Sequence, residues 1–218
     1  MPCITGHIGN HMLPPPRWFI PLDTTVQLFT GIVAVAVALY ALRGYRWIRE
    51  SSLQNLFMAF MLLGIAFLVN GTTMAYAFNE HIPFDQTSGS GMVLQVGFAI
   101  YYGFSIVAYG LLLYTYCRQW GSVAAAPLGP LVVFSSPPLE LVIILLLGGI
   151  LLAQLLREVR PGRGMQGVVS LSFALLMASH ILILFETGDY TTYFLAKGLQ
   201  LAGFALMGVM LYRVGRRR

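Results

Sequence analysis

The sequence predicts an all-α integral membrane protein with seven transmembrane helices, its amino terminus outside and its carboxyl terminus inside the cell. Three observations lead to this prediction: an apolar composition, the distribution of arginine and an internal repeat. Hydrophobic residues make up 57% of the chain and charged residues 10%, and the mean hydropathy is +0.75. A soluble domain with this composition would be unable to cover its surface with polar groups. The long unbroken apolar runs favour helices over the alternating strands of a membrane barrel.

Six apolar runs are long enough to span the hydrocarbon core, which takes about 20 residues of helix. They lie at residues 23–42, 53–77, 92–116, 139–156, 166–185 and 191–212. The segment 121–138 is also uncharged, but it is short and is interrupted by Pro127 and Pro130. Hydropathy alone therefore leaves two alternatives: seven spans, or six spans plus a re-entrant segment.

Arginine decides between these alternatives, because cytoplasmic loops are enriched in Lys and Arg. The arginine-bearing gaps hold Arg43, Arg46 and Arg49; Arg118; Arg157, Arg160 and Arg163; and Arg213, Arg216, Arg217 and Arg218. The other gaps hold Glu80 and Asp85, and later Glu186 and Asp189. With six spans, the gap at 157–163 would face outside and break the rule. The arginine pattern therefore favours seven spans.

The two halves of the chain repeat three short patterns in the same order. Pro21-Leu22-Asp23 and Pro138-Leu139-Glu140 each open a span, where the acid would complement the dipole at a helix start. Residues 60–63 (FMLL) match 173–176 (FALL), and residues 110–114 (GLLLY) match 208–212 (GVMLY). We expect two parallel three-helix units with a linker helix, a 3+1+3 layout; the alternative is that leucine-rich helices align by chance. The expected segments are an external tail (1–20), a first unit (21–118), the linker (119–137), a second unit (138–213) and a basic cytoplasmic tail (214–218).

Polar side chains at membrane depth are costly and usually face the bundle interior or a pathway. The last two spans and the turn between them carry four such candidates: His180, Glu186, Lys197 and Gln200. The short turn makes these helices antiparallel neighbours, so we expect Lys197 to interact with His180 or Glu186. Such a pair would be proton-responsive or would bind an anion. The alternative is a lysine that extends to the interface and a histidine bonded across helices.

The third span carries a second set of candidates at intervals of seven residues, and these should share one face of the helix. They are Gln95, Tyr102, Tyr109 and Tyr116. This stripe would line a cavity or stack on an apolar ligand such as a quinone; the alternative is packing, with hydroxyls bonded to neighbouring helices. Asn70, Gln27 and Gln154 are single polar residues in other spans and are expected to form interhelical hydrogen bonds.

A candidate metal site lies outside the predicted spans. Cys3, His7 and His11 recur every four residues, and His81 falls in a gap on the same side. Sulfur and imidazole ligands suit copper or zinc, although Gly6 and Gly9 disfavour a helix there, and the alternative is an ordinary polar tail. The motifs of P-loop, zincin, hydrolase and Rossmann enzymes are absent, so catalysis is not predicted and no cofactor is identified. The expected partners are the lipid bilayer and other membrane proteins, with no nucleic acid, because the arginines bordering spans account for the net charge of +5.

Parts of the first two and last two spans resemble poorly characterised seven-span membrane proteins of archaea, some of which stand alone and some of which look like sensory input modules. The matching phrases are Leu22-Asp23, residues 41–46 (ALRGYR), Ser179-His180 and residues 195–204 (LAKGLQLAGF). The resemblance implies the fold, and Lys197 stands where a histidine is expected in such proteins. The 3+1+3 layout is also similar to that of the SWEET sugar transporters, but their proline-glutamine signature is missing from both units.

Three functions from different classes follow from these observations. The first is a non-enzymatic accessory or sensory subunit within a membrane complex, including an energy-transducing one. The second is a small-solute or ion transporter or channel built on the two three-helix units. The third is a membrane protein that binds a metal or haem outside. All three place the chain in the plasma membrane as a multi-pass protein.

Overall fold

The computed structural model describes residues 19–79, 89–118, 136–158, 166–185 and 190–216. These form the helices α1 (Phe19–Ile48), α2 (Ser51–Asn79), α3 (Gly89–Arg118), α4 (Ser136–Glu158), α5 (Gln166–Leu184) and α6 (Tyr190–Arg216). Each helix is long and apolar enough to cross a membrane. The prediction of an α-helical membrane protein with six long apolar helices is therefore confirmed for the described residues. Residues 121–135 of the candidate seventh span lie outside the described residues, and its last three residues, 136–138, belong to α4.

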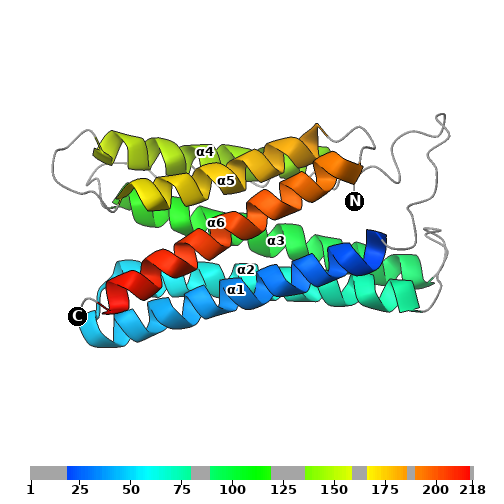
Figure 1. Cartoon of the computed structure of the whole chain (residues 1–218), viewed down its shortest axis with the longest axis horizontal. Helices are drawn as coiled ribbons and strands as arrows, with labels where there is room; N and C mark the ends of the chain where they lie inside the picture. Colours follow the sequence, from blue (N-terminus) through cyan, green and yellow to red (C-terminus); the bar gives the residue numbers. More distant parts are fainter. Residues whose placement is uncertain (1–18, 80–88, 119–135, 159–165, 186–189, 217–218) are drawn as a thin grey trace.

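The six helices form a closed ring in chain order. Each helix packs against the next one along the chain, and α6 packs back against α1. The ring comprises two groups of three consecutive helices, α1 to α3 and α4 to α6. Figure 1 shows α4 and α5 above, α1 and α2 below, and α3 and α6 crossing between them. The contacts between α3 and α4 and between α6 and α1 join the two groups.

The helices at the first of these junctions, α3 and α4, run in the same direction. Tyr102 on α3 contacts Glu140 on α4, and further along both helices Leu113 packs against Gly149. A parallel pair cannot be joined by a short turn. Arg118, where α3 ends, therefore lies at the opposite end of the bundle from Ser136, where α4 begins (Figure 1).

The helices at the other junction, α6 and α1, are also parallel, as the order of their contacts shows. Tyr193 contacts Asp23 near the starts of the two helices, and the rings of Tyr40 and Tyr212 pack edge to face near their ends, with centroids 6.2 Å apart. Four helices, α1, α3, α4 and α6, thus share one direction, whereas α2 and α5 run the other way.

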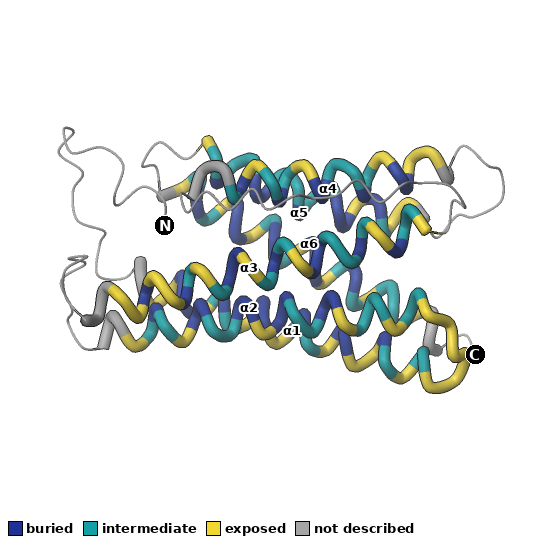
Figure 2. Tube along the Cα trace, turned by 180° about the vertical axis from the view of Figure 1, so that it is seen from behind, coloured by how far each residue is buried: buried dark blue, intermediate teal, exposed yellow. Residues whose placement is uncertain are grey.

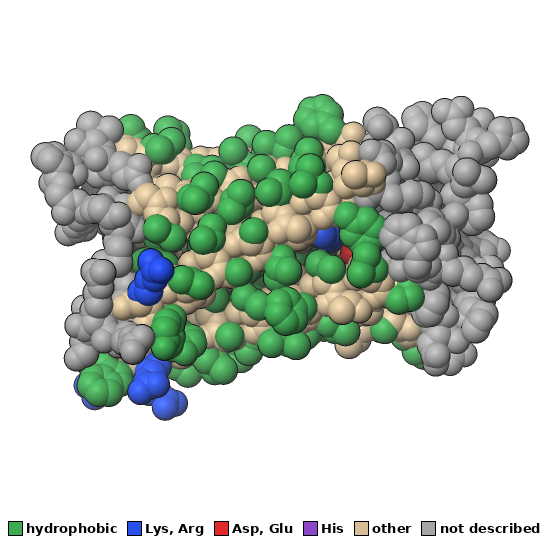
Figure 3. All heavy atoms as spheres, viewed as in Figure 1, with side chains coloured by type: hydrophobic (Ala, Val, Ile, Leu, Met, Phe, Trp, Pro, Cys, Tyr) green, Lys and Arg blue, Asp and Glu red, His purple; other side chains and the backbone are tan. Residues whose placement is uncertain are grey.

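The two ends of the bundle differ in charge. The carboxylate end contains the starts of α1 and α4, with Asp23 and Glu140. The arginine end contains the ends of α1, α3 and α6, with Arg46, Arg118 and Arg213. Figure 3 shows basic side chains gathered at the arginine end. The described arginines at the ends of three parallel helices therefore lie on one side.

The outer surface of the ring is apolar. Phe29, Ile32, Leu145, Leu152 and Leu195 are all more than half exposed. Figure 2 shows buried positions facing the interior along every helix, and Figure 3 shows hydrophobic side chains covering the flank between the ends. An apolar band of this extent is unfavourable in water and suits contact with lipid.

The middle of the bundle is filled by aromatic side chains. Phe204 of α6 packs edge to face against Phe60 and Phe67 of α2, and Phe67 packs against Tyr101 of α3. These side chains are almost fully buried and belong to one hydrophobic core. Quadrupolar edge-to-face pairs add about 0.5–1.5 kcal/mol each beyond area burial. The aromatic cluster thus closes the interior below the carboxylate end.

Glycine allows α1 and α2 to approach closely. A Cβ atom on Gly31 would lie 2.9 Å from Leu68 Cγ, and one on Gly64 would lie 3.2 Å from the backbone nitrogen of Val35. Small residues at a helix crossing bring backbones close enough for extensive van der Waals contact, which drives helix association in lipid. This crossing sets the position of Gln27 and Asn70, which lie one to two turns closer to the carboxylate end.

Candidate functional site

Two acidic residues form the centre of a polar cluster at the carboxylate end. Asp23 and Glu140 are 1% and 2% exposed, so both carboxyl groups are buried. The expectation that they lie at helix starts is wrong, because α1 begins at Phe19 and α4 at Ser136, and the first turn of each contains no acid. One further turn of helix moves each carboxyl group from the helix end into the bundle, where it needs other partners.

Glu140 is held by one residue from each neighbouring helix. The Tyr102 hydroxyl of α3 donates to Glu140 Oε1 at 3.0 Å, and His180 Nδ1 of α5 lies 2.7 Å from Glu140 Oε2. The histidine is fully buried, and its other ring nitrogen, Nε2, has no hydrogen-bond partner among the described residues. The histidine and glutamate therefore form a buried ion pair when His180 carries a proton. The pair ties α4 to α5, and Tyr102 adds α3.

Asp23 is held in a similar way on the other side of the ring. The Tyr193 hydroxyl of α6 donates to Asp23 Oδ1 at 2.7 Å, and Gln27 Nε2 donates to Asp23 Oδ2 at 2.9 Å. Asn70 of α2 in turn donates to Gln27 Oε1 at 2.5 Å. Both junctions between the helix groups thus carry the same bond, from a tyrosine to the carboxylate of a parallel neighbour. A hydrogen bond to a charged group is worth about 1.5–3 kcal/mol.

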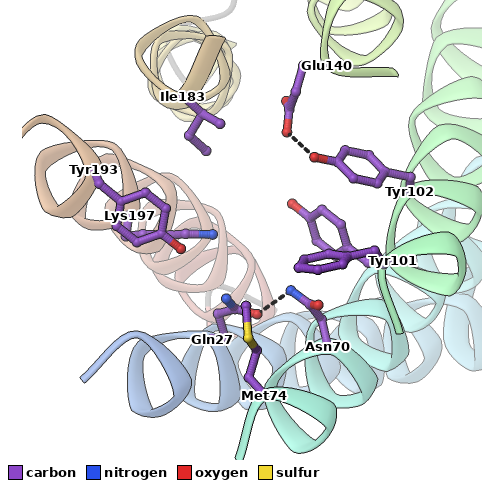
Figure 4. A pocket seen from close by; sticks show the side chains of 10 residues that line it. Gln27, Asn70, Met74, Tyr101, Tyr102, Glu140, Ile183, Tyr193 and Lys197 are labelled. Atoms are coloured by element: carbon purple, nitrogen blue, oxygen red, sulfur yellow. Dashed lines mark hydrogen bonds between the residues drawn. The ribbon is translucent and has the colours of Figure 1, made fainter. Parts of the chain in front are cut away.

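Lys197 of α6 extends into the space between these two clusters. Its residue is 6% exposed, and its ammonium nitrogen lies 5.3 Å from the centre of the Tyr193 ring. Figure 4 shows the ammonium group directed to the centre of the cavity, with Glu140 and Tyr102 on the far side. In the described ranges, no carboxylate oxygen lies within 4.0 Å of this nitrogen. The ammonium group and Glu140 line the same cavity, but they form no ion pair.

The cavity itself is small and central. Its volume is about 30 Å³, and all six helices contribute to its lining, which comprises Gln27, Asn70, Met74, Phe98, Tyr101, Tyr102, Glu140, Ile183, Tyr193 and Lys197. At about 10–15 Å³ for each water molecule, this space holds a few waters or a ligand of similar size. Figure 3 shows one basic and one acidic side chain at the bottom of a hollow between α6 and α1, close to the carboxylate end.

The charges in this end of the bundle balance only when a proton is bound. The described ionisable groups other than tyrosine are two carboxyl groups, Asp23 and Glu140, and two bases, Lys197 and His180. With a neutral His180, the cluster would carry one net negative charge in a medium of low dielectric constant, which is costly. A proton shared by Glu140 and His180 removes that charge.

The predicted site residues fall into three groups in the structure. His180, Lys197, Gln200, Asn70, Tyr102 and Tyr109 are buried, whereas Gln95 is exposed, and Glu186 lies outside the described residues. His180 pairs with Glu140, so the expected pairing with Lys197 is wrong. The cause is depth: His180 reaches the level of the start of α4, which packs beside α5.

The expected stripe on α3 is interrupted at its outer end. Tyr102 and Tyr109 face the interior, but Gln95 faces outward. A spacing of seven falls short of two full turns by about 20°, so the stripe drifts around the helix away from the core. Tyr109 contacts the ring of His180 edge to face, with centroids 6.2 Å apart. Gln200 is buried as well, and its Nε2 atom has no hydrogen-bond partner among the described residues.

The candidate metal ligands Cys3, His7, His11 and His81 all lie outside the described residues. Within the helices that the structure describes, no group of three or more His, Cys, Asp or Glu side chains is placed to hold a metal ion.

Sequence reasoning missed Asp23, Glu140 and Tyr193 as members of the site. The repeat had already singled out the two acids, because each follows a Pro-Leu pair in the equivalent position of its half. Their burial would have been recognised had the helices been extended by one turn towards the amino terminus. No local signal marks Tyr193, because its role depends on the packing of α6 against α1. No protein-family model matches the chain, and neither the curated proteins nor the solved structures include a significant match.

Proposed function

We propose that this protein is a non-enzymatic sensory or accessory subunit of the membrane, and that protonation of the Glu140–His180 pair controls its conformation. The observation that carries the proposal is the 2.7 Å contact between two fully buried ionisable side chains on different helices. Loss of its proton would leave an uncompensated charge inside the bundle, and a change in helix packing would relieve that charge. The net charge of a buried histidine–carboxylate pair changes when it gains or loses one proton, so the pair suits a pH response.

The test is a distance measurement at two pH values. Spin labels at Leu141 on α4 and Tyr76 on α2 would sit on lipid-facing positions at the carboxylate end, because both side chains are about half exposed. In nanodiscs, we expect the distance distribution to differ between about pH 5 and about pH 8, on either side of the ordinary histidine titration. In the Glu140→Gln background the difference should vanish. A wild-type protein whose distances are independent of pH would refute the proposal.

A histidine control makes this test specific. The chain contains three other histidines, His7, His11 and His81. A variant with all three replaced by glutamine should keep the wild-type pH response if His180 is the responsible group. If the response disappears in this variant and persists in His180→Phe, the sensor lies elsewhere in the chain.

The proposed topology has seven spans, with the carboxylate end outside and the arginine end in the cytoplasm. The parallel pairs α3/α4 and α6/α1 support it, because residues 119–135 must then return from one end of the bundle to the other. Cysteines introduced at Ser122 and Ser136 would test it with an impermeant thiol reagent. Labelling from opposite sides is expected, and labelling of both from the same side would exclude the seventh crossing. In this topology the protein is a multi-pass protein of the plasma membrane.

The 3+1+3 repeat is part of the same proposal. A rotation by half a turn about the bundle axis would exchange α1, α2 and α3 with α4, α5 and α6. The ring order is compatible with such a rotation, and so are the matching bonds Tyr102 to Glu140 and Tyr193 to Asp23. The halves differ in the second hydrogen-bond partner of each acid. Asp23 is bonded to Gln27, which is bonded to Asn70, whereas Glu140 contacts His180. On this proposal the first half is structural and the second half titrates.

A small-solute or ion transporter is the second candidate, because all six helices line the central cavity. Flux through proteoliposomes that Lys197→Ala abolishes and Arg213→Gln preserves would favour this candidate. Tight vesicles without flux would favour the sensor.

The proposed partners are the lipid bilayer and other membrane proteins. Purification in mild detergent tests this directly: a second protein in stoichiometric amount supports an accessory role, and the chain alone supports a stand-alone sensor.

A further inference from the structure

Lys197 is a largely buried cation that forms no ion pair with a described carboxylate. An ammonium group has three donors, and in water all three are satisfied. In the structure, its neighbour is the face of the Tyr193 ring, and the nitrogen is directed into the cavity (Figure 4). Burying a charged group without hydrogen-bond acceptors costs several kcal/mol. A ligand in the cavity that accepts hydrogen bonds from Lys197 would remove most of this cost.

Glu140, Asn70 and Gln27, which also line the cavity, already have partners. Both oxygens of Glu140 are bonded, one to Tyr102 and one to His180. Asn70 donates to Gln27, and Gln27 donates onward to Asp23. The carboxylates are thus engaged by donors of their own, and the ammonium group of Lys197 remains available to bind a ligand.

We infer that the central cavity is a binding site for a small monovalent inorganic anion, of halide or nitrate size, held by Lys197. The cavity of about 30 Å³ sets the upper limit on size and excludes larger organic ligands. The ring of Tyr193 and the apolar side chains of Met74, Phe98 and Ile183 complete the lining. These apolar groups lower the local dielectric constant, which strengthens the attraction between the anion and the ammonium group.

Charge balance couples this anion to a proton. The charged and titratable groups that line the cavity with Glu140 are Tyr101 and Tyr102 from α3 and Tyr193 and Lys197 from α6, while the described part of α2 contributes the neutral Asn70. Tyr109 of α3 contacts the ring of His180, and Asp23 of α1 is bonded to Tyr193. With His180 protonated, the cluster is neutral, and an anion adds one negative charge. Protonation of Glu140 restores neutrality. The anion should therefore bind together with a proton and more tightly in acid. This coupling deepens the proposed function, whereas the site itself stands on Lys197 alone.

Anion titrations of the purified full-length protein in detergent test the site. The thermal unfolding temperature would be followed while sodium gluconate is replaced by chloride, bromide or nitrate at constant ionic strength. We expect a saturable increase in the unfolding temperature with the small anions and none with gluconate. Lys197→Met should weaken the fitted affinity by at least about 30-fold, as expected for loss of one partner of a buried charge pair. Arg213→Gln, which removes an exposed cation at the other end, should leave it unchanged.

A second variant keeps the inference falsifiable if Lys197→Met does not fold. Glu140→Gln removes a negative charge facing the cavity and imitates the protonated carboxyl group. Anion binding to this variant should be tighter and independent of pH, because the charge of Glu140 is gone while Lys197 is unchanged. Equal stabilisation by chloride and gluconate would overturn the anion site, and weaker binding in Glu140→Gln would overturn its coupling to a proton. A pH response that persists in gluconate without anion binding would overturn the anion site and leave the proposed function intact.

Discussion

The energetic coupling between Glu140 and His180 gives the most direct test of the site. Breaking a buried ion pair by removing one partner costs about 3–5 kcal/mol, because an uncompensated charge remains. His180→Phe also removes the unpartnered Nε2 atom, and relief of a buried unsatisfied group returns about 1–3 kcal/mol. The single variant should therefore lose about 2 kcal/mol of unfolding free energy at neutral pH. Glu140→Gln replaces the charge by a neutral acceptor and isolates the charged part of the interaction.

A double-mutant cycle separates this coupling from the packing effects of each substitution. Unfolding of wild type, His180→Phe, Glu140→Gln and the double variant would be followed by circular dichroism during titration of detergent micelles with SDS. We expect a coupling energy of about 2 kcal/mol at neutral pH that falls below about 1 kcal/mol in acid, because a protonated carboxyl group leaves no charge to compensate.

Ser179→Ala is the matched control for this cycle. Ser179 is as buried as His180, but its hydroxyl bonds only the carbonyl oxygen of Leu176 in its own helix. Its coupling to Glu140→Gln should be within about 0.5 kcal/mol of zero at every pH. A coupling between Glu140 and His180 that is equally small, or that does not change with pH, would refute the assignment of a buried ion pair.

Two further predictions concern the junctions and the helix crossing. Tyr102→Phe and Tyr193→Phe should each cost about 1.5–3 kcal/mol of unfolding free energy, since each removes a hydrogen bond to a carboxylate, whereas the half-exposed Tyr212→Phe should cost less than about 0.5 kcal/mol. Similar losses for all three tyrosines would contradict the two junction bonds. Gly64→Val should destabilise by about 1–3 kcal/mol or more, because even a Cβ atom there collides with α1, whereas Gly103→Ala, with open space around it, should be neutral or stabilising. Thermal unfolding in detergent measures the stability of the tyrosine and glycine variants. A Gly64→Val variant as stable as the wild type would mean that α1 and α2 are further apart than in the structure.

The fold was largely predictable because membrane helices are specified by local composition. Each of the six apolar runs became a helix, and the structure extends several of them by a turn or more at their ends. Hydropathy reports the residues that must avoid water, so it places the start of a helix at the first residues of the apolar run and misses a further turn before them. Asp23 and Glu140 were assigned to helix ends for this reason, although their carboxyl groups are inside the bundle.

Only some of the residues that form the site were predictable from the sequence, and their contacts were not. His180, Lys197, Asn70 and Tyr102 were singled out because polar groups at membrane depth are rare and need partners. Their pairing was not predictable. Sequence proximity suggested Lys197 as the partner of His180, but the actual partner, Glu140, lies on a helix that the connection between α5 and α6 does not constrain.

The sequence alone determined that this chain is a membrane protein, where its helices lie and which few polar residues they bury, because each of these properties depends on a short stretch of residues and its solvent. Tertiary structure alone decided that α3 and α4 are parallel, that a tyrosine joins a carboxylate at each junction, and that Lys197 faces a cavity without an ion-pair partner among the described residues. Those properties depend on how helices distant in sequence pack against one another. In lipid that packing is set by the fit of small and aromatic side chains and by a few interhelical hydrogen bonds, which no single segment encodes.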